Sequence, residues 1–337
     1  MQGLLKSNHG REVGISHLTK AFAEAFDRRA IPADAVESRW AAPDGHGIRR
    51  IDWPEPAGPV RGSLLFMPGR GDAYEKYLET FEHWRGRGWQ VTAADWRGQA
   101  GSGRLGNDEV TGHVDDFAHW IADLAAFWRD WAHGRHGPLV LAGHSMGGHL
   151  ALRSVAEGVL VPRPAALVLS VPMLDVRPEA VPAPLRHGLA RAMCALGDAR
   201  RPAWKWSERP GEIPKFRQEL LTHDPARYSD ELWWREARPE LVMGPGSWGW
   251  VRAALASIRA LERPGALEAV DPPVFIVATS ADRLVGPRAI RQAERRLPNA
   301  RSLWFGTEAA HEILREADPV RDRALAGIDQ FLDGVTG

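Results

Sequence analysis

PLVLAGHSMGGHLALRSVAEG, residues 138–158, is the stretch that decides the fold, because it joins a buried strand to a helix through one sharp turn. Residues 138–142 form a short apolar run of the kind found in buried strands. The residues after Gly147 predict a helix. Between the two lies Gly143-His144-Ser145-Met146-Gly147, and a G-x-S-x-G sequence at a strand–turn–helix junction predicts a nucleophilic serine. We expect a strained Ser145 with glycines that let the backbone close around it.

Further apolar runs with little polar alternation predict other strands of the same sheet. Continuous runs of this kind favour parallel strands that are buried on both faces. Stretches with helical spacing of apolar residues, such as 114–134, lie between the runs, so the sequence predicts an α/β fold with a mostly parallel central sheet flanked by helices. Residues 1–50 predict a leading helix and an antiparallel hairpin. The apolar runs are 62–71, 89–98, 165–174, 272–285 and 301–306.

The alternation of strand and helix stops between about residues 173 and 250. This part is helical in character and rich in proline, arginine and tryptophan, and it holds no clear buried strand. It lies between two runs that predict strands of one sheet. We therefore expect a core formed by residues 1–172 and 251–337, with a helical cap, residues 173–250, inserted in it.

Composition excludes several classes of protein. The chain has 337 residues with 43 basic and 43 acidic side chains, so net charge gives no reason to expect nucleic acid as a partner. Cys194 is the only cysteine, and no metal-binding motif is present, so neither a disulfide, a metal nor a cofactor is expected. No apolar run has signal-peptide character or the length of a membrane span. The expectation is a cytoplasmic protein, with peripheral contact to the inner face of the membrane left open.

A serine nucleophile at such a turn requires an acid and then a histidine further along the chain. Asp282 directly follows the apolar run ending in "VFIVATS", and His311 follows "RSLWFG" in the segment before the last helix. We expect His311 to take the proton of Ser145 and Asp282 to orient the imidazole. Asp175, after the run "LVLS", is the alternative acid.

The residues next to the serine in the turn and in the loop after residues 63–69 suggest further roles. The backbone N–H groups of Met146 and Arg70 are the candidates for an oxyanion hole, since one follows the nucleophile and the other follows the run "SLLFMPG". His144 and His149 flank the serine and are expected to point elsewhere on the turn.

Several segments of the chain are similar to one known family. The chain resembles the α/β-hydrolase fold and, within it, the group of lysophospholipases and monoacylglycerol lipases, most closely the bacterial lysophospholipase L2 type. The loop of residues 68–77 has Asp72 and Lys76 as like-charged replacements and retains Tyr77, while Pro68 stands where the group usually has histidine and Ala100 replaces a glycine. The matching segments are GHSMGG (143–148), PGRGDAYEKY (68–77), DWRGQAGSGR (95–104), AAHEILRE (309–316), LTHDPARYSDE (221–231) and GPGSWGWVRAAL (244–255).

The resemblance implies hydrolysis of an ester between an alcohol and an acyl chain, through an acyl-enzyme on Ser145. It implies a lipid ester such as a lysophospholipid or a monoacylglycerol, with Tyr77, Trp248 and Trp250 as candidate substrate-binding residues. Two alternatives remain open. One is an amide, peptide or thioester hydrolase with the same three residues, for which acidic side chains of the cap would hold a substrate ammonium. The other is a protein of this fold that binds a ligand without turnover.

Overall fold

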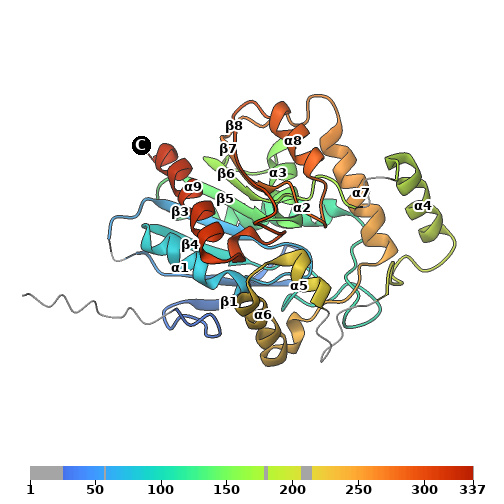
Figure 1. The fold of residues 1–337 in the computed structure, drawn as a ribbon, viewed down its shortest axis with the longest axis horizontal. Helices are drawn as coiled ribbons and strands as arrows, with labels where there is room; N and C mark the ends of the chain where they lie inside the picture. Colours follow the sequence, from blue (N-terminus) through green and yellow to red (C-terminus); the bar gives the residue numbers. More distant parts are fainter. Residues whose placement is uncertain (1–25, 57, 178–180, 206–214, 337) are drawn as a thin grey trace, which may run out of the picture.

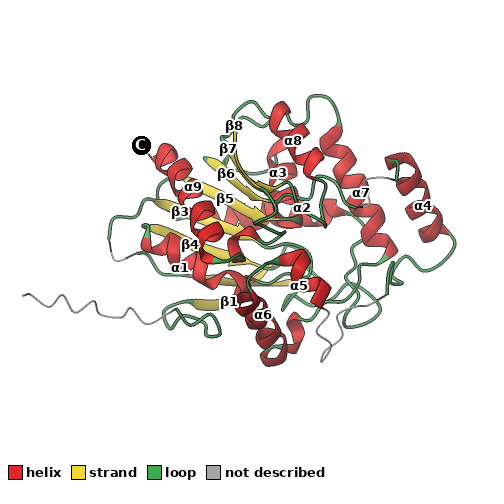
Figure 2. Cartoon of the chain, viewed as in Figure 1, coloured by secondary structure: helices red, strands yellow, loops and turns green. Residues whose placement is uncertain are grey.

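The computed structural model describes residues 26–56, 58–177, 181–205 and 215–336. Its centre is one eight-stranded sheet, with strands in the order β1-β2-β4-β3-β5-β6-β7-β8 (Figures 1 and 2). β1 and β2 are antiparallel to their neighbours, and β3 to β8 run parallel. The predicted α/β fold with a mostly parallel sheet is confirmed. The strands are β1 (Val36–Ala41), β2 (Gly47–Asp52), β3 (Gly62–Met67), β4 (Trp89–Ala94), β5 (Leu139–His144), β6 (Ala166–Ser170), β7 (Val274–Thr279) and β8 (Ala300–Phe305).

Helices cover both faces of the sheet. On one face, Phe81 of α1 (Leu78–Gly86) packs against Phe66 of β3, and Phe331 of α9 (Asp318–Thr336) stacks on Phe275 of β7. On the other face, Trp131 donates a hydrogen bond to Thr92 of β4. The helices of that face are α2 (Phe117–Ala132), α3 (Met146–Ala156) and α8 (Pro287–Arg296). Because both faces are covered, the inner parallel strands β3, β6 and β7 are entirely buried, as their continuous apolar runs predict, whereas the edge strand β8 is only partly buried.

The segment between β6 and β7 contains four more α-helices in its described residues. They are α4 (Ala183–Ala195), α5 (Lys215–Leu221), α6 (Pro225–Ala237) and α7 (Trp248–Glu262), and α4 packs along α7 (Figure 1). We use the name cap segment for residues 173–250, as predicted from the sequence. The division of the chain at 172 and 250 stays a prediction, and α7 extends across the second boundary.

Two further predictions concern the N-terminal segment of the chain and helices that could span a membrane. The predicted N-terminal hairpin is formed by β1 and β2, whereas the leading helix lies outside the described residues. None of the helices in the described ranges is both long enough and apolar enough to cross a membrane. The cytoplasmic location and the contact with a membrane surface stay predictions.

Short 3₁₀ helices lie at Tyr74–Tyr77, Pro239–Leu241 and Ile313–Arg315.

Candidate active site

Ser145 occupies a strained turn between β5 and α3. Its backbone has φ 50° and ψ −115°, a conformation with positive φ that costs energy for a residue with a side chain. A Cβ on Gly147 would lie 2.2 Å from the carbonyl oxygen of Met67, and a Cβ on Gly143 would lie 2.7 Å from the backbone of Gly147. Glycine is therefore required at both positions, because Gly147 packs directly against the end of β3 and Gly143 packs directly against the first turn of α3.

His311 and Asp282 come together beyond the carboxyl ends of β8 and β7. The Nδ1 atom of His311 lies 2.7 Å from Oδ2 of Asp282, and Oδ1 of Asp282 accepts hydrogen bonds from the amides of Leu284 and Val285. Burial alone would lower the pKa of His311, but the charge and hydrogen bond of Asp282 outweigh burial, and the pKa of His311 is raised. The same pair of interactions outweighs burial at Asp282 and lowers the pKa of its carboxyl group. The arrangement holds an imidazole that can carry a proton beside a carboxylate that stays ionised.

Asp175, the alternative acid, and His149, which follows the serine turn, have side chains that bind other groups than the proposed catalytic residues. Asp175 forms an ion pair with Arg186 at 2.7 Å and makes no hydrogen bond to His311 within the described part of the chain. His149 is buried on α3, where its Nε2 atom lies 2.6 Å from Ser257 Oγ, and burial together with Arg153 lowers its pKa to about 3. His149 therefore points away from the turn, as expected from the sequence.

His144 does not follow the expectation. It lines the same cavity as Ser145, its ring packs edge-on against the ring of His311, and its Nδ1 atom lies 3.1 Å from Asp72 Oδ2. Its Nε2 atom lies 3.3 Å from the carbonyl oxygen of His311. The expectation that His144 points elsewhere is wrong, because the residue before the nucleophile packs between the loop after β3 and the histidine loop. No periodicity in the sequence signals this contact.

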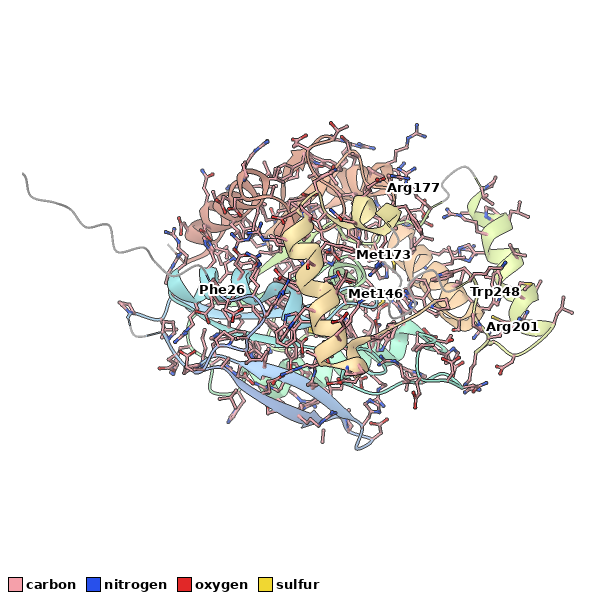
Figure 3. All side chains as sticks on the ribbon, turned by 60° about the horizontal axis from the view of Figure 1, so that its bottom comes forward. Phe26, Met146, Met173, Arg177, Arg201 and Trp248 are labelled. Atoms are coloured by element: carbon pink, nitrogen blue, oxygen red, sulfur yellow. The ribbon has the colours of Figure 1, made fainter. Side chains whose placement is uncertain are left out.

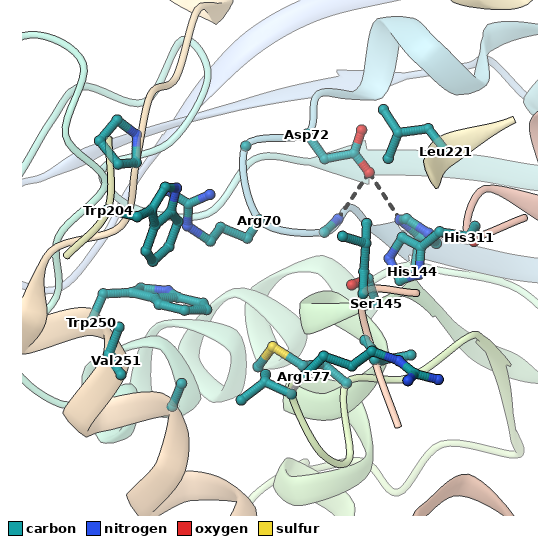
Figure 4. Close-up of a pocket in the computed structure, with 18 of the residues that line it drawn as sticks. Arg70, Asp72, His144, Ser145, Arg177, Trp204, Leu221, Trp250, Val251 and His311 are labelled. Atoms are coloured by element: carbon teal, nitrogen blue, oxygen red, sulfur yellow. Dashed lines mark hydrogen bonds and ion pairs between the residues drawn. The ribbon is translucent and has the colours of Figure 1, made fainter. Parts of the chain in front are cut away.

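A cavity of about 510 Å³ contains both Ser145 and His311 in its lining (Figure 4). Trp248 and Trp250, two predicted substrate-binding residues, also line it. Tyr77, the third, does not line the cavity: it is buried behind the lining and donates a hydrogen bond to Asp72. In Figure 3, Met146 lies near the middle of the molecule, and Trp248 lies on the side of α4. The apolar lining residues are Met173, Val176, Ala203, Trp204, Leu221, Trp248, Trp250, Val251, Ala254, Leu284 and Val285.

The two candidate oxyanion-hole residues lie beside the serine. The register of β3 and β5 pairs Met67 with Gly143, so the loop after β3 runs next to the turn, and Arg70 lines the cavity. The neighbouring amides fix this loop, since Gly69 donates to Asp72 Oδ2 and Gly71 donates to Gln99 Oε1. Met146 is the first residue of α3, where backbone N–H groups have no acceptor within the helix. The positions are compatible with two donors that converge near Ser145.

A group of buried charged side chains adjoins the cavity, which we call the ion cluster: Asp72, Lys76, Glu231, Glu312 and Arg315. The Nζ atom of Lys76 lies 2.9 Å from Asp72 Oδ1 and 3.2 Å from Glu231 Oε2, and it also contacts Glu312. Arg315 pairs with Glu231 and Glu312. Burial would raise the pKa values of Glu231 and Glu312, but the attraction of Lys76 and the arginines outweighs burial and lowers both. The carboxylates are thus ionised and compensated.

A protein-family model described as serine aminopeptidase, S33, matches residues 58–318 of this chain. The chain belongs to this hydrolase family. Lysophospholipase L2 of Escherichia coli (strain K12) is 28% identical over 284 residues, 80% of each chain. The probable lysophospholipase L2 of Haemophilus influenzae is 24% identical over 281 residues, 83% of this chain and 86% of its own.

The solved structures that this family member resembles have the same fold. A soluble variant of monoglyceride lipase from Saccharomyces cerevisiae, in complex with a substrate analog, superposes with a TM-score of 0.73 and 20% identity, covering 93% of this chain and 98% of its own. A monoacylglycerol lipase from Paleococcus ferrophilus gives a TM-score of 0.64 at 20% identity, covering 86% and 99%. The resemblance to the lysophospholipase and monoacylglycerol lipase group is confirmed, and so is the predicted enzyme class, a carboxylic ester hydrolase.

Proposed function

We propose that the protein hydrolyses the carboxylic ester of a small lipid, of the lysophospholipid or monoacylglycerol type, through an acyl-enzyme on Ser145. One observation carries the proposal: a serine on a strained turn shares an apolar cavity with a histidine whose Nδ1 atom is hydrogen-bonded to a buried carboxylate. The names of the relatives, lysophospholipase L2 and monoglyceride lipase, support the same chemistry.

The reaction proceeds by acyl transfer in two stages. Ser145 Oγ attacks the ester carbonyl while His311 Nε2 takes its proton, and Asp282 holds the imidazole in the tautomer that this transfer needs. The amides of Met146 and Arg70 stabilise the tetrahedral oxyanion. His311 then protonates the leaving alcohol. In the second stage, water activated by His311 attacks the acyl-enzyme and releases the fatty acid.

The family model is described as a serine aminopeptidase. The charges around the cavity nevertheless favour an ester substrate over a peptide with a free amino group. An aminopeptidase needs an uncompensated carboxylate to hold the substrate ammonium. In the part of the chain that the structure describes, the acidic residues outside the catalytic pair that line the cavity are Asp72 and Glu312, and both contact Lys76. Glu231, an acidic side chain of the cap segment, pairs with Lys76 and Arg315. A substrate ammonium would therefore have to displace an existing cation.

A substrate panel tests the proposal. p-Nitrophenyl esters of increasing acyl length are compared with an aminoacyl anilide, and a fluorophosphonate probe reports whether Ser145 reacts. We expect turnover of the esters, a preference for apolar acyl chains, labelling of Ser145 and negligible hydrolysis of the anilide. Efficient anilide hydrolysis would support the peptidase alternative. Failure of every ester, together with absence of labelling, would support a ligand-binding protein without turnover.

A further inference from the structure

The cavity has two chemically different ends. Figure 4 shows Trp204, Trp250 and Val251 on one side of Ser145, and His311 and the guanidinium of Arg177 on the other. The side with the two indoles, against which the Arg70 guanidinium lies, is the one that suits an acyl chain. If the acyl chain occupies that side, the alcohol part of the ester lies toward Arg177.

The basic side chains that line the cavity differ in the groups with which they form ion pairs or hydrogen bonds. Lys76 faces three carboxylates of the ion cluster, and Arg217 pairs with Glu231 at 3.0 Å. Arg70 donates to the carbonyl oxygen of Gly244 and lies against the rings of Trp204 and Trp250. Lys76 and Arg70 thus join the core to the cap segment, and Arg217 forms its ion pair within the cap segment.

Arg177 is different. Its Nη2 atom donates a 2.8 Å hydrogen bond to the main-chain carbonyl oxygen of Asp282, and no carboxylate in the described ranges forms an ion pair with it. The side chain is exposed to solvent at the cavity. Its backbone is fixed, since the amide of Arg177 donates to Leu284 and the adjacent Val176 bridges to Val285. A positive charge is thus held at the alcohol end of the cavity, on the loop that contacts the Asp282 carbonyl.

Among the carboxylates of the described ranges that lie at the cavity, none is left to cancel this charge. The cavity carboxylates Asp72 and Glu312 are compensated by Lys76, and Asp282 is paired with His311. A guanidinium presents donors in a planar fork that matches the oxygens of a phosphate. The remaining hydrogen-bonding capacity of Arg177 therefore suits an anionic tetrahedral group beside the ester.

We propose that Arg177 binds a phosphate carried by the alcohol part of the substrate, so that acyl esters of a phosphorylated alcohol are preferred to those of an uncharged alcohol. This inference rests on the proposed ester hydrolysis at Ser145. It makes Arg177 the specificity-determining residue between a lysophospholipid and a monoacylglycerol.

The test compares 1-octanoylglycerol with 1-octanoylglycerol 3-phosphate, which differ only in the phosphate, below the concentrations at which either forms micelles. The measured quantity is the ratio of kcat/KM for the phosphorylated ester to kcat/KM for the neutral one. We expect the wild type to favour the phosphorylated ester and Arg177→Gln to lower the ratio by about tenfold or more, a change of about 1.4 kcal/mol. Arg177→Lys keeps the charge but not the planar fork and should give a ratio between those of the wild type and Arg177→Gln. Arg191→Gln, an exposed arginine of α4 outside the cavity lining, is the matched control and should leave the ratio unchanged.

A ratio that does not change in Arg177→Gln overturns the inference, including the case in which both substrates lose activity equally because the Asp282 loop has moved. Glycerol 3-phosphate and inorganic phosphate are also tested as inhibitors of 1-octanoylglycerol hydrolysis. Inhibition by inorganic phosphate without a preference for the phosphorylated ester would identify a site for free phosphate and overturn the assignment. If the wild type hydrolyses neither ester, the p-nitrophenyl ester panel and the labelling of Ser145 decide the proposed function. Calorimetry with glycerol 3-phosphate then decides the inference separately: weaker binding to Arg177→Gln supports it, and equal binding overturns it.

Discussion

The main-chain carbonyl of Leu221, the last residue of α5, accepts a 2.7 Å hydrogen bond from the amide of Glu312. Glu312 directly follows His311, whose own amide donates to the carbonyl of Leu220 at 3.3 Å. Farther along, Thr222 Oγ1 donates to the carbonyl oxygen of Arg315. The position of His311 therefore depends on the cap segment as well as on the sheet, and the ion cluster strengthens the same junction.

The Ser145→Ala variant should lose ester hydrolysis while it keeps its fold, because only the proposed nucleophilic oxygen is removed. kcat/KM for a p-nitrophenyl ester and the thermal unfolding midpoint are measured together. Ser154→Ala is the matched control, since the Ser154 hydroxyl is buried on α3 and has no hydrogen-bond partner in the described structure. Residual activity of Ser145→Ala above about one part in a thousand would count against this serine as the nucleophile.

The Asp282→Asn variant should reduce kcat by roughly 10³–10⁴, because an amide stabilises the wrong tautomer of His311. Asp175→Asn tests the alternative acid and breaks only the ion pair with Arg186, so we expect kcat to change by less than about threefold. The two variants are assayed side by side with the same ester. A larger loss in Asp175→Asn would show that the acid is misassigned.

The pH dependence of hydrolysis reflects the environment of His311. The reaction needs the neutral imidazole, so kcat/KM should rise with pH through the pKa of His311. Burial alone would lower that pKa, but Asp282, with smaller contributions from Glu312 and Asp72, raises it above the ordinary value of 6.5. The midpoint of the acidic limb should therefore lie above 6.5 in the wild type.

Asp282→Asn provides the control for the pH profile, because it removes the negative charge that raises the pKa. The midpoint of its residual activity should shift to lower pH. kcat/KM is measured between about pH 5 and pH 9 at constant ionic strength. An unchanged midpoint would mean that the observed ionisation belongs to a group other than His311.

The Lys76→Met variant should lower the free energy of unfolding by about 3–5 kcal/mol, because it leaves buried Asp72 without its lysine partner and removes one of the cations that compensate the two glutamates of the ion cluster. Urea unfolding measures the change. Arg163→Gln is the control: it breaks the exposed pair between Arg163 and Asp271 and should cost less than about 1 kcal/mol. If Lys76→Met is no more destabilising than this surface variant, the ion cluster does not stabilise the junction of cap segment and core.

Local sequence determined the fold class and the order of the proposed catalytic residues. Strands buried on both faces must be continuously apolar, and a turn as tight as that at Ser145 admits only glycine at 143 and 147, so both features are readable in short stretches. The carboxyl ends of parallel strands also lie at one edge of their sheet, so the loops after β7 and β8 are neighbours. Asp282 and His311 stand in these two loops, which is why their pairing could be predicted from sequence.

Only the tertiary structure decided which side chains line the cavity. Tyr77 lies behind the lining and His144 within it, although both stand in matching motifs. Lys76 meets Glu231 and Glu312, which are far away in the sequence, and the contact of Arg177 with the Asp282 carbonyl depends on how two loops pack. Contacts between side chains of distant segments leave no periodicity in the sequence, because they are set by the packing of the whole chain rather than by the conformation of any one stretch.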